Sequence, residues 1–346
     1  MTRSLSLLFL LSGLLPAEVN SAEDMLIKAI LHGDLPKMET LLSLGVDPNL
    51  TDPDGQTPLS LAMVVVNDTK AVELLLRSHA DPNATLNSHW RGTPLEYAAH
   101  TGNLHLIRIL LAAGARIDAN AVHVAAAERQ LDVLHLLIEK GADVNTRDAQ
   151  GAAPLDDAIW NESLDSIAIL LAHGARVNEA NTQTGATPLN EAAYRGSAPV
   201  IRYLLHFQPD LGIPDKRGYT ALDNALRKGH EDCAVLLLEA KLNSGADPKG
   251  PQLENAALKG WNGIAALLLD HGANVNQIDA ASGTTALYAA SSFGRASTVK
   301  LLLDRGANPN LCGSNRKTPY QAALENGYND VAAQIERRGG AKSCAP

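Results

Sequence analysis

The feature that most constrains the fold of this chain is a short motif that returns along most of its length. One copy reads GATPLNEAAYRG and begins at Gly185. The copies opened by Thr187 and Thr220 lie 33 residues apart. Other copies open at Thr57, Thr93, Ala153, Thr285 and Thr318, and degenerate copies open at Asp24, Asn120 and Pro251. A repeat of this period predicts a row of stacked supersecondary units, each burying its apolar face against its neighbours.

Each residue type in the motif favours a pair of helices. Threonine accepts a hydrogen bond from the first helical turn, and proline fits the next position because its missing N–H had no partner there. Alanine pairs such as Ala192-Ala193 let a second helix approach closely. That second helix is rich in leucine and ends at a glycine such as Gly174, which closes a helix in the left-handed conformation at little cost. A short hairpin loop then leads to the next repeat.

These recurring positions resemble the ankyrin repeat family, whose pattern is Thr-Pro-Leu-His-x-Ala-Ala, a turn glycine, a leucine-rich helix, Gly-Ala-Asp-Val-Asn and a β-hairpin. The likeness covers about residues 23 to 340, or nine to ten repeats including the capping repeats. It implies an all-α ankyrin-repeat solenoid of stacked helix-turn-helix units with short β-hairpin loops. The motif histidine is replaced by Ser60, Glu96, Asp156, Asn190, Asp223 and Tyr288. The sequence therefore does not predict the hydrogen bonds that this histidine supplies between loops in the family.

The repeats are irregular at several places. Almost no residues separate consecutive repeats at 118–120 and at 249–251, so two hairpin loops are expected to be missing. The repeat opened by Thr220 carries about four extra residues around 241–244, and the loop at 84–92 is slightly long. We expect these irregularities to bend the stack locally and to expose a groove between about Asn120 and Pro251.

The N-terminus has the pattern of a signal peptide. Arg3 precedes an apolar run from Leu5 to Leu15, which is too short to span a bilayer but typical of an h-region. We expect cleavage after Ser21 or Ala22 and an exported protein, periplasmic or secreted, of bacterial type. A buried or amphipathic first helix is the alternative. The expected organisation is a signal peptide at 1–22, an ankyrin repeat solenoid at 23–340 and a C-terminal tail at 341–346.

Composition and motifs limit the chemistry. A formal net charge of −9 argues against nucleic-acid binding, which relies on many Lys and Arg contacts. The sequence holds no Gly-x-Ser-x-Gly, phosphate-loop or His-Glu-x-x-His motif. His79, His173 and His271 lie near helix ends, where the helix dipole favours a partly cationic ring. We therefore expect no enzyme, no cofactor, no metal site and no membrane span, and nothing in the sequence indicates a homo-oligomer.

The chain has three cysteines, an odd number for an exported protein. Cys233 falls among the apolar positions of a helix and is expected to be buried. Cys312 and Cys344 lie in corresponding loop regions one repeat apart. The alternatives for these two are a disulfide that closes the C-terminal end, and thiols that stay reduced or pair between chains.

In a stack of this type, the residues before each turn glycine and those at the hairpin tips point onto one concave face. The tips include Lys216 and Arg217. Aromatic and arginine side chains dominate binding hot spots, and a local basic patch favours an acidic partner. A solvated end-of-helix position is the alternative for each. The candidate partner-binding residues are Trp90, Trp160, Tyr194, Arg195, Tyr219, Arg227, Lys228, Lys259 and Phe293.

The function expected from the sequence is non-catalytic capture of a protein partner with an acidic surface. An exported bacterial ankyrin protein would neutralise a toxin as a periplasmic immunity factor, or support a periplasmic enzyme. An enzyme or metal protein using the groove is a competing class. A eukaryotic cytoplasmic scaffold is a third, and it requires the first 22 residues to stay attached.

Overall fold

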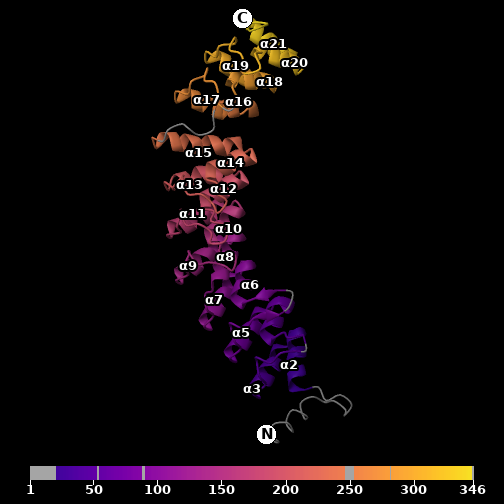
Figure 1. The fold of residues 1–346 in the computed structure, drawn as a ribbon. Helices are drawn as coiled ribbons and strands as arrows, with labels where there is room; N and C mark the ends of the chain where they lie inside the picture. Colours follow the sequence, from indigo (N-terminus) through magenta and orange to yellow (C-terminus); the bar gives the residue numbers. More distant parts are fainter. Residues whose placement is uncertain (1–20, 53, 88–89, 246–252, 281, 345–346) are drawn as a thin grey trace. The chain divides into compact units, whose positions relative to one another are not determined.

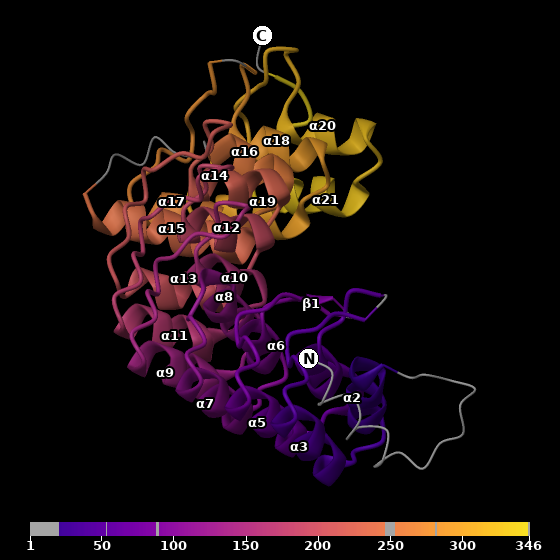
Figure 2. The same cartoon turned by 90° about the horizontal axis from the view of Figure 1, so that it is seen from below.

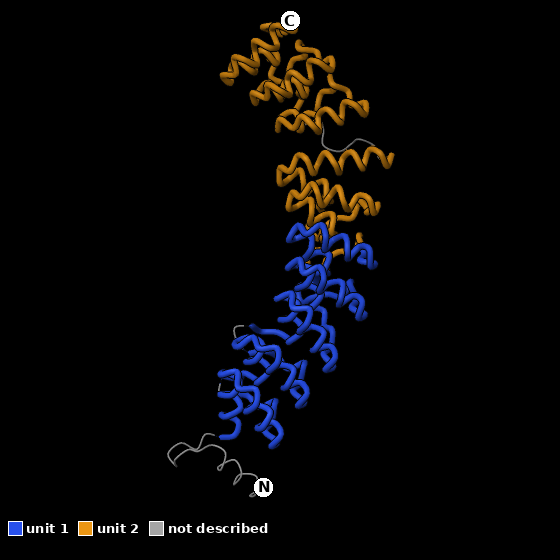
Figure 3. Tube along the Cα trace, turned by 180° about the vertical axis from the view of Figure 1, so that it is seen from behind, with its two compact units in different colours: residues 1–176 blue, residues 177–346 orange. Residues whose placement is uncertain are grey.

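A computed structural model describes residues 21–344, apart from 53, 88–89, 246–252 and 281. The chain divides into two compact units, residues 1–176 and 177–346 (Figure 3). Each unit is a stack of antiparallel helix pairs joined by loops, as the resemblance to ankyrin repeats implied. The fold class expected from the sequence is therefore confirmed.

Unit 1 has two layers of helices. The first helix of each pair packs on the first helix of the next pair, and the second helices form the other layer (Figures 1 and 2). The first-helix layer contains α2 (Ala22–Leu31), α4 (Pro58–Ser60) with the π-helix η1 (Leu61–Val66), α6 (Pro94–His100), α8 (Ala119–Ala127) and α10 (Pro154–Trp160). The second-helix layer contains α3 (Leu35–Ser43), α5 (Thr69–Arg77), α7 (Leu104–Ala112), α9 (Leu131–Glu139) and α11 (Leu164–Ala172).

Unit 2 repeats this arrangement. Its first-helix layer contains α12 (Pro188–Arg195), α14 (Ala221–Lys228), α16 (Leu253–Lys259), α18 (Ala286–Ser292) and α20 (Pro319–Glu325). Its second-helix layer contains α13 (Ala198–Leu205), α15 (Glu231–Asn243), α17 (Asn262–Asp270), α19 (Ala296–Asp304) and α21 (Asn329–Arg337).

The motif residues act as the sequence predicted. The Thr187 side chain accepts a hydrogen bond from the Asn190 N–H, and Pro188 occupies the first turn of α12. Ala192 and Ala193 are fully buried between the helices. Gly196 ends α12 in the left-handed conformation, with φ of 83°. The same threonine cap recurs at Thr57, Thr93, Thr220, Thr285 and Thr318.

A ladder of asparagine side chains links consecutive repeats. Asn145 Nδ2 donates to the Gly174 carbonyl at 3.1 Å, and Asn145 Oδ1 accepts from the Arg176 N–H at 3.0 Å. Each such pair of bonds ties one loop to the end of the second helix in the next repeat. Equivalent pairs are made by Asn49, Asn83, Asn276 and Asn310. Gly212 stands at the corresponding position of the α12–α13 repeat and has no side chain to form this link.

The structure accounts for the irregular repeats. No strand pairing precedes α8 in the described residues, and Asp118 replaces the motif threonine as its cap by accepting from the Ala121 N–H. The long loop at 84–92 forms a hairpin of β1 (Leu86–Asn87) and β2 (Arg91–Gly92), antiparallel with Leu86 opposite Gly92 (Figure 2). The extra residues around 241–244 lengthen α15 to 13 residues. The junction at 249–251 lies outside the described residues.

The C-terminal end is closed by a disulfide. Cys312 and Cys344 are bonded, with their Cα atoms 6.1 Å apart, so the first of the two alternatives holds. The Ala341 N–H donates to Asn310 Oδ1, and the Thr318 hydroxyl donates to the Ala341 carbonyl. Residues 341–344, expected to form a tail, are thus held against the last repeat. Cys233 is buried in α15, as predicted.

The signal-peptide prediction concerns residues that lie almost entirely outside the described part of the chain. Ser21 is the first described residue, and it caps α2 in a reciprocal pair of bonds with Asp24. Among the helices that the structure describes, none is both long enough and apolar enough to cross a membrane.

Candidate functional site

Four of the predicted residues, two tyrosines and two cations, lie together in unit 2. The Lys228 ammonium lies 4.0 Å from the centre of the Tyr194 ring, and the Arg227 guanidinium lies 4.1 Å from the centre of the Tyr219 ring. Arg217 lies between them, 5.5 Å from the Tyr194 ring and 5.9 Å from the Tyr219 ring. We call these five residues the tyrosine–cation cluster.

The repeat itself brings these residues together. Tyr194 lies in the last turn of α12, and Arg227 follows it by 33 positions in the last turn of α14. Stacking of the two helices therefore places them in neighbouring repeats on corresponding ends. Arg217 and Tyr219 come from the intervening loop, which is shaped by Asp215. The Asp215 carboxylate accepts from the N–H groups of Arg217 at 2.9 Å and Tyr219 at 3.0 Å.

The cations of the cluster differ in their partners. Arg217 forms an ion pair of 2.9 Å with the buried Asp215 carboxylate. Burial opposes ionisation of Asp215, but hydrogen bonds from Tyr219 and Arg217 outweigh it and hold its pKa below the ordinary value. Arg227 and Lys228 form no ion pair with any described carboxylate. Only one of the three cations is thus neutralised within the described residues.

The two tyrosine rings hold the neighbouring cations in place. A cation over an aromatic face is held by the ring quadrupole, which contributes about 0.5–1 kcal/mol at an exposed site. Lys228 also lowers the pKa of the Tyr194 phenol through a hydrogen bond and its charge. The rings therefore fix where the cations stand, while the ammonium and guanidinium groups remain exposed.

Glu191 lies one turn before Tyr194 on α12 and is not part of the cluster. One of its carboxyl oxygens is buried and has no hydrogen-bond partner. Burial raises the pKa of Glu191, and the nearby charges of Arg195 and Arg217 offset this only in part. Arg195, a predicted partner-binding residue, is half-buried. Its positive charge interacts with the Glu191 carboxyl, and Arg195 does not belong to the tyrosine–cation cluster.

The remaining predicted residues lie elsewhere. Lys259 is exposed, with its ammonium 5.9 Å from the Trp261 ring, and Phe293 is 48% exposed at the end of α18. Trp160 is 55% exposed at the end of α10 in unit 1. Each of these three side chains lies in a different repeat from the cluster.

Trp90 anchors the hairpin of unit 1. Its ring packs edge-on against Tyr97 at 5.8 Å between centroids and lies over His100 at 4.8 Å. The side chain is half-buried against α6 instead of standing free at the tip. Trp90 therefore shapes the loop of its own repeat.

Two residues that are prominent in the structure were not among the predicted site residues. Arg217 was noted only as a tip residue, although its place between Asp215 and Tyr219 was a usable signal. His123 was overlooked because its repeat opens with Asn120 instead of threonine, yet Asn120-Ala121-Val122-His123 keeps the motif histidine. His123 is 6% exposed, and its Nδ1 lies 2.5 Å from Asp157 Oδ2, which joins α8 to α10.

Residues that replace the motif histidine also bond between repeats, which the sequence did not predict. The Asn120 amide of α8 donates to Glu96 of α6 at 3.1 Å. The Asn190 amide donates to the carbonyls of Ile213 and Tyr219 in the next loop. Glu96 and Asn190, which stand at the position of the motif histidine, therefore link neighbouring repeats, as His123 does.

The three histidines that were expected near helix ends lie there. His173 and His271 each place Nδ1 within hydrogen-bond distance of a carbonyl in the last turn, at 2.8 and 2.9 Å. His79 itself occupies the position at which a left-handed glycine ends the equivalent helices, with φ of 70°. In the described residues no three His, Cys, Asp or Glu side chains are grouped so as to hold a metal ion.

Comparison with known proteins extends the repeat assignment. The family profile described as "Ankyrin repeats (3 copies)" matches residues 26–121, 61–148, 118–181, 155–249 and 253–339. The chain is 33% identical over 210 residues to human "Ankyrin repeat and SOCS box protein 16", covering 55% of this chain and 46% of that protein. It is 34% identical over 175 residues to "Probable E3 ubiquitin-protein ligase XBOS33" of Oryza sativa subsp. japonica, covering 48% of this chain and 34% of that protein.

A solved structure is also similar. The crystal structure of the ankyrin repeat domain of Bcl-3 aligns with a TM-score of 0.54 and 28% identity, covering 64% of this chain and 99% of that chain. The chain spans half or less of the length of the two curated relatives. The profile matches extend over most of the sequence and coincide with the helix pairs of both units. The chain therefore belongs to the ankyrin repeat family, whose stacked repeats serve as protein-binding modules.

Proposed function

We propose that this chain is an exported, non-catalytic protein that captures a protein partner through an acidic surface on that partner. The observation that carries the proposal is the tyrosine–cation cluster. In a chain of net charge −9, Arg227 and Lys228 stand exposed and without a described carboxylate beside them. A concentrated positive site on an acidic protein favours carboxylates of a partner and disfavours basic partners.

Preorganisation supports this role for the cluster. Ordering a long side chain at an interface costs about 0.5–1.5 kcal/mol, and a side chain already held in place loses less on binding. The Tyr194 and Tyr219 rings hold Lys228 and Arg227 from adjacent repeats before any partner arrives. We therefore expect the cations to make the contacts and the tyrosines to keep them in register.

Export is part of the proposal and has two supports. The apolar run from Leu5 to Leu15 has the length of a signal-peptide h-region. Disulfides such as Cys312–Cys344 persist in oxidising compartments and are uncommon in the cytosol. Within a bacterial periplasm we propose an immunity factor that neutralises a toxin. Support of a periplasmic enzyme is the second candidate, and the identity of the captured partner distinguishes the two.

A non-catalytic role agrees with the family, whose fold is a protein-interaction scaffold. One relative is named as a probable E3 ubiquitin-protein ligase, but the alignment covers only 34% of that protein. That name describes the relative and does not assign ligase activity to this chain.

Affinity capture with a charge-reversed variant tests the proposal. The variant Arg227→Glu/Lys228→Glu reverses the two exposed cations that form no ion pair with a described carboxylate, and Lys300→Glu reverses an exposed charge on α19 as the control. Wild type and control should retain one partner that is released by salt and by a glutamate-rich synthetic peptide, which competes with the partner for the cations of the cluster. Capture of that same partner by the folded double variant would remove the cluster from the interface.

A further inference from the structure

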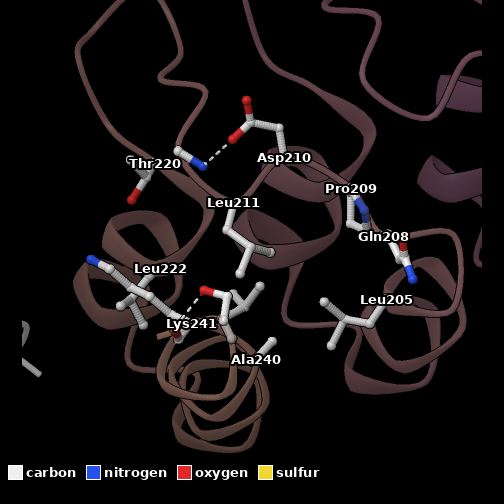
Figure 4. Close-up of a pocket in the computed structure, with 12 residues that line it drawn as sticks. Leu205, Gln208, Pro209, Asp210, Leu211, Thr220, Leu222, Ala240 and Lys241 are labelled. Carbon is white, nitrogen blue, oxygen red and sulfur yellow. Dashed lines mark hydrogen bonds between the residues drawn. The ribbon is translucent and has the colours of Figure 1, made fainter. Parts of the chain in front are cut away.

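Unit 2 contains a cavity that the proposed protein-binding role does not use. Its volume is about 620 Å³, and it lies between α13, α14 and α15 (Figure 4). Leucine side chains from all three helices and from the preceding loop form its wall, namely Leu205, Leu211, Leu222 and Leu237. We call it the leucine cavity. It opens at the start of α14, whereas Arg227 and Lys228 lie at the end of that helix.

Two departures from the repeat pattern build the leucine cavity. Gly212 replaces the ladder asparagine, so the loop at 208–212 has no side chain at this position to tie it to the end of α15. In the same repeat pair, α15 has 13 residues where α17 and α19 have 9, and the added turn contributes Lys241 and Ser244 to the wall. The cavity is therefore specific to this place in the stack.

The charged groups at the cavity differ in their partners. Asp210 Oδ1 accepts a hydrogen bond of 2.8 Å from the Gly212 N–H, as Figure 4 shows. The Lys241 side chain is half-buried, and its ammonium forms no ion pair or hydrogen bond with the described residues. Because this ammonium has no counter-ion among the described residues, its positive charge would favour an anionic group bound at the same wall of the cavity.

We propose that the leucine cavity binds an aliphatic carboxylate, with the hydrocarbon chain among the four leucines and the carboxylate at Lys241. Pockets for small ligands usually have volumes of about 300–1,000 Å³, mostly apolar walls and few polar groups that fix orientation. This cavity has that size and that distribution of groups. The proposal is independent of the partner captured by the tyrosine–cation cluster.

Calorimetric titration of the purified full-length protein with sodium decanoate, and separately with decanol, tests the site. Ala240→Phe fills the cavity from a half-exposed wall position, and Ser244→Phe narrows it from an exposed one. Asn243→Phe adds the same ring on an exposed position of α15 that does not line the cavity. Decanoate binding should weaken more than tenfold in the two blocking variants and stay unchanged in the control.

Two further variants test whether the carboxylate of the ligand lies at Lys241. Lys241→Ala should weaken decanoate about tenfold and leave decanol unchanged, whereas Asp210→Asn should strengthen decanoate by removing a competing negative charge. Absence of decanoate binding to the wild-type protein overturns the proposal. It is equally overturned if Ala240→Phe and Ser244→Phe, shown to be folded by circular dichroism, bind decanoate as tightly as Asn243→Phe. Equal losses of decanoate and decanol in Lys241→Ala would refute the carboxylate position.

Discussion

Removal of the Cys312–Cys344 disulfide should loosen the C-terminal repeat without affecting the rest of unit 2. The bond closes a loop of 32 residues that contains α20 and α21. In a stack of repeats each helix pair contacts only its neighbours, so a cross-link at one end stabilises mainly that end. The perturbation is the double variant Cys312→Ser/Cys344→Ser, which leaves Cys233 in place.

The size of the effect follows from the length of the closed loop. In the chain-entropy treatment, cross-linking a loop of 32 residues removes unfolded-state freedom worth about 3.7 kcal/mol at 25 °C. A difference of 1.4 kcal/mol is a factor of ten, so the opening equilibrium of this repeat should rise by about 500-fold. The hydrogen bonds from Ala341 and Thr318 that hold residues 341–344 should also be lost.

Native-state hydrogen exchange measures this opening directly, because amide protection reports the free energy of local unfolding. Amides of α20 and α21 should exchange up to about 500-fold faster in the double variant than in the oxidised wild type. Amides of α12 and α13, several repeats away, serve as the internal control and should keep their protection.

Two results would refute this reasoning. Unchanged protection in α20 and α21 would mean that the cross-link does not restrain this repeat. An equal loss of protection in α12 and α13 would mean that the unit opens as a whole, which contradicts nearest-neighbour stabilisation. Mass spectrometry of the untreated wild type, before and after reduction, establishes that the bond is present in the sample.

Three further predictions concern polar side chains that form hydrogen bonds. Burial raises the pKa of Glu96 above 4.5, so the folded state is more stable at low pH, where Glu96 is protonated, and loses that stability as the pH rises and Glu96 ionises. Glu96→Gln should therefore have a higher urea midpoint of unfolding than wild type at pH 7 and the same midpoint near pH 4. His123→Ala should destabilise unit 1 by about 1–3 kcal/mol in urea unfolding, because the partly buried Asp157 carboxylate loses the bond that joins α8 to α10, whereas His105→Ala at an exposed site should not. A protein that begins at Ser21 should be about 1 kcal/mol more stable than one that begins at Glu23, because only the first keeps the cap of α2; equal thermal midpoints would contradict this.

The helix pairs were predictable because their signals are local. Thr187 caps its own helix, Pro188 occupies its first turn and Gly196 ends it, so neighbouring residues determine each boundary. The burial of Ala192 and Ala193 follows from the need of the second helix to approach closely. Stacking at a fixed repeat then places Tyr194 beside the residues that follow it by one period, which is why part of the cluster was predicted.

The features that were missed or left open depend on geometry between repeats. Arg217 reaches both rings only because Asp215 shapes the loop, and a tip position by itself does not reveal this. The leucine cavity depends on a side chain that Gly212 lacks, which is visible only against the asparagine ladder of the other repeats. Pairing of Cys312 with Cys344 required the distance between two loops, which sequence spacing alone left undecided.

The most direct test of the account is the affinity of the purified captured partner, measured by titration calorimetry against four forms of the protein. They are wild type, Lys300→Glu, Tyr194→Leu/Tyr219→Leu and Arg227→Glu/Lys228→Glu. Binding should be unchanged for Lys300→Glu, about tenfold weaker for the tyrosine variant, and at least hundredfold weaker for the charge-reversed variant. Equal affinity of Arg227→Glu/Lys228→Glu and Lys300→Glu for the partner would contradict it.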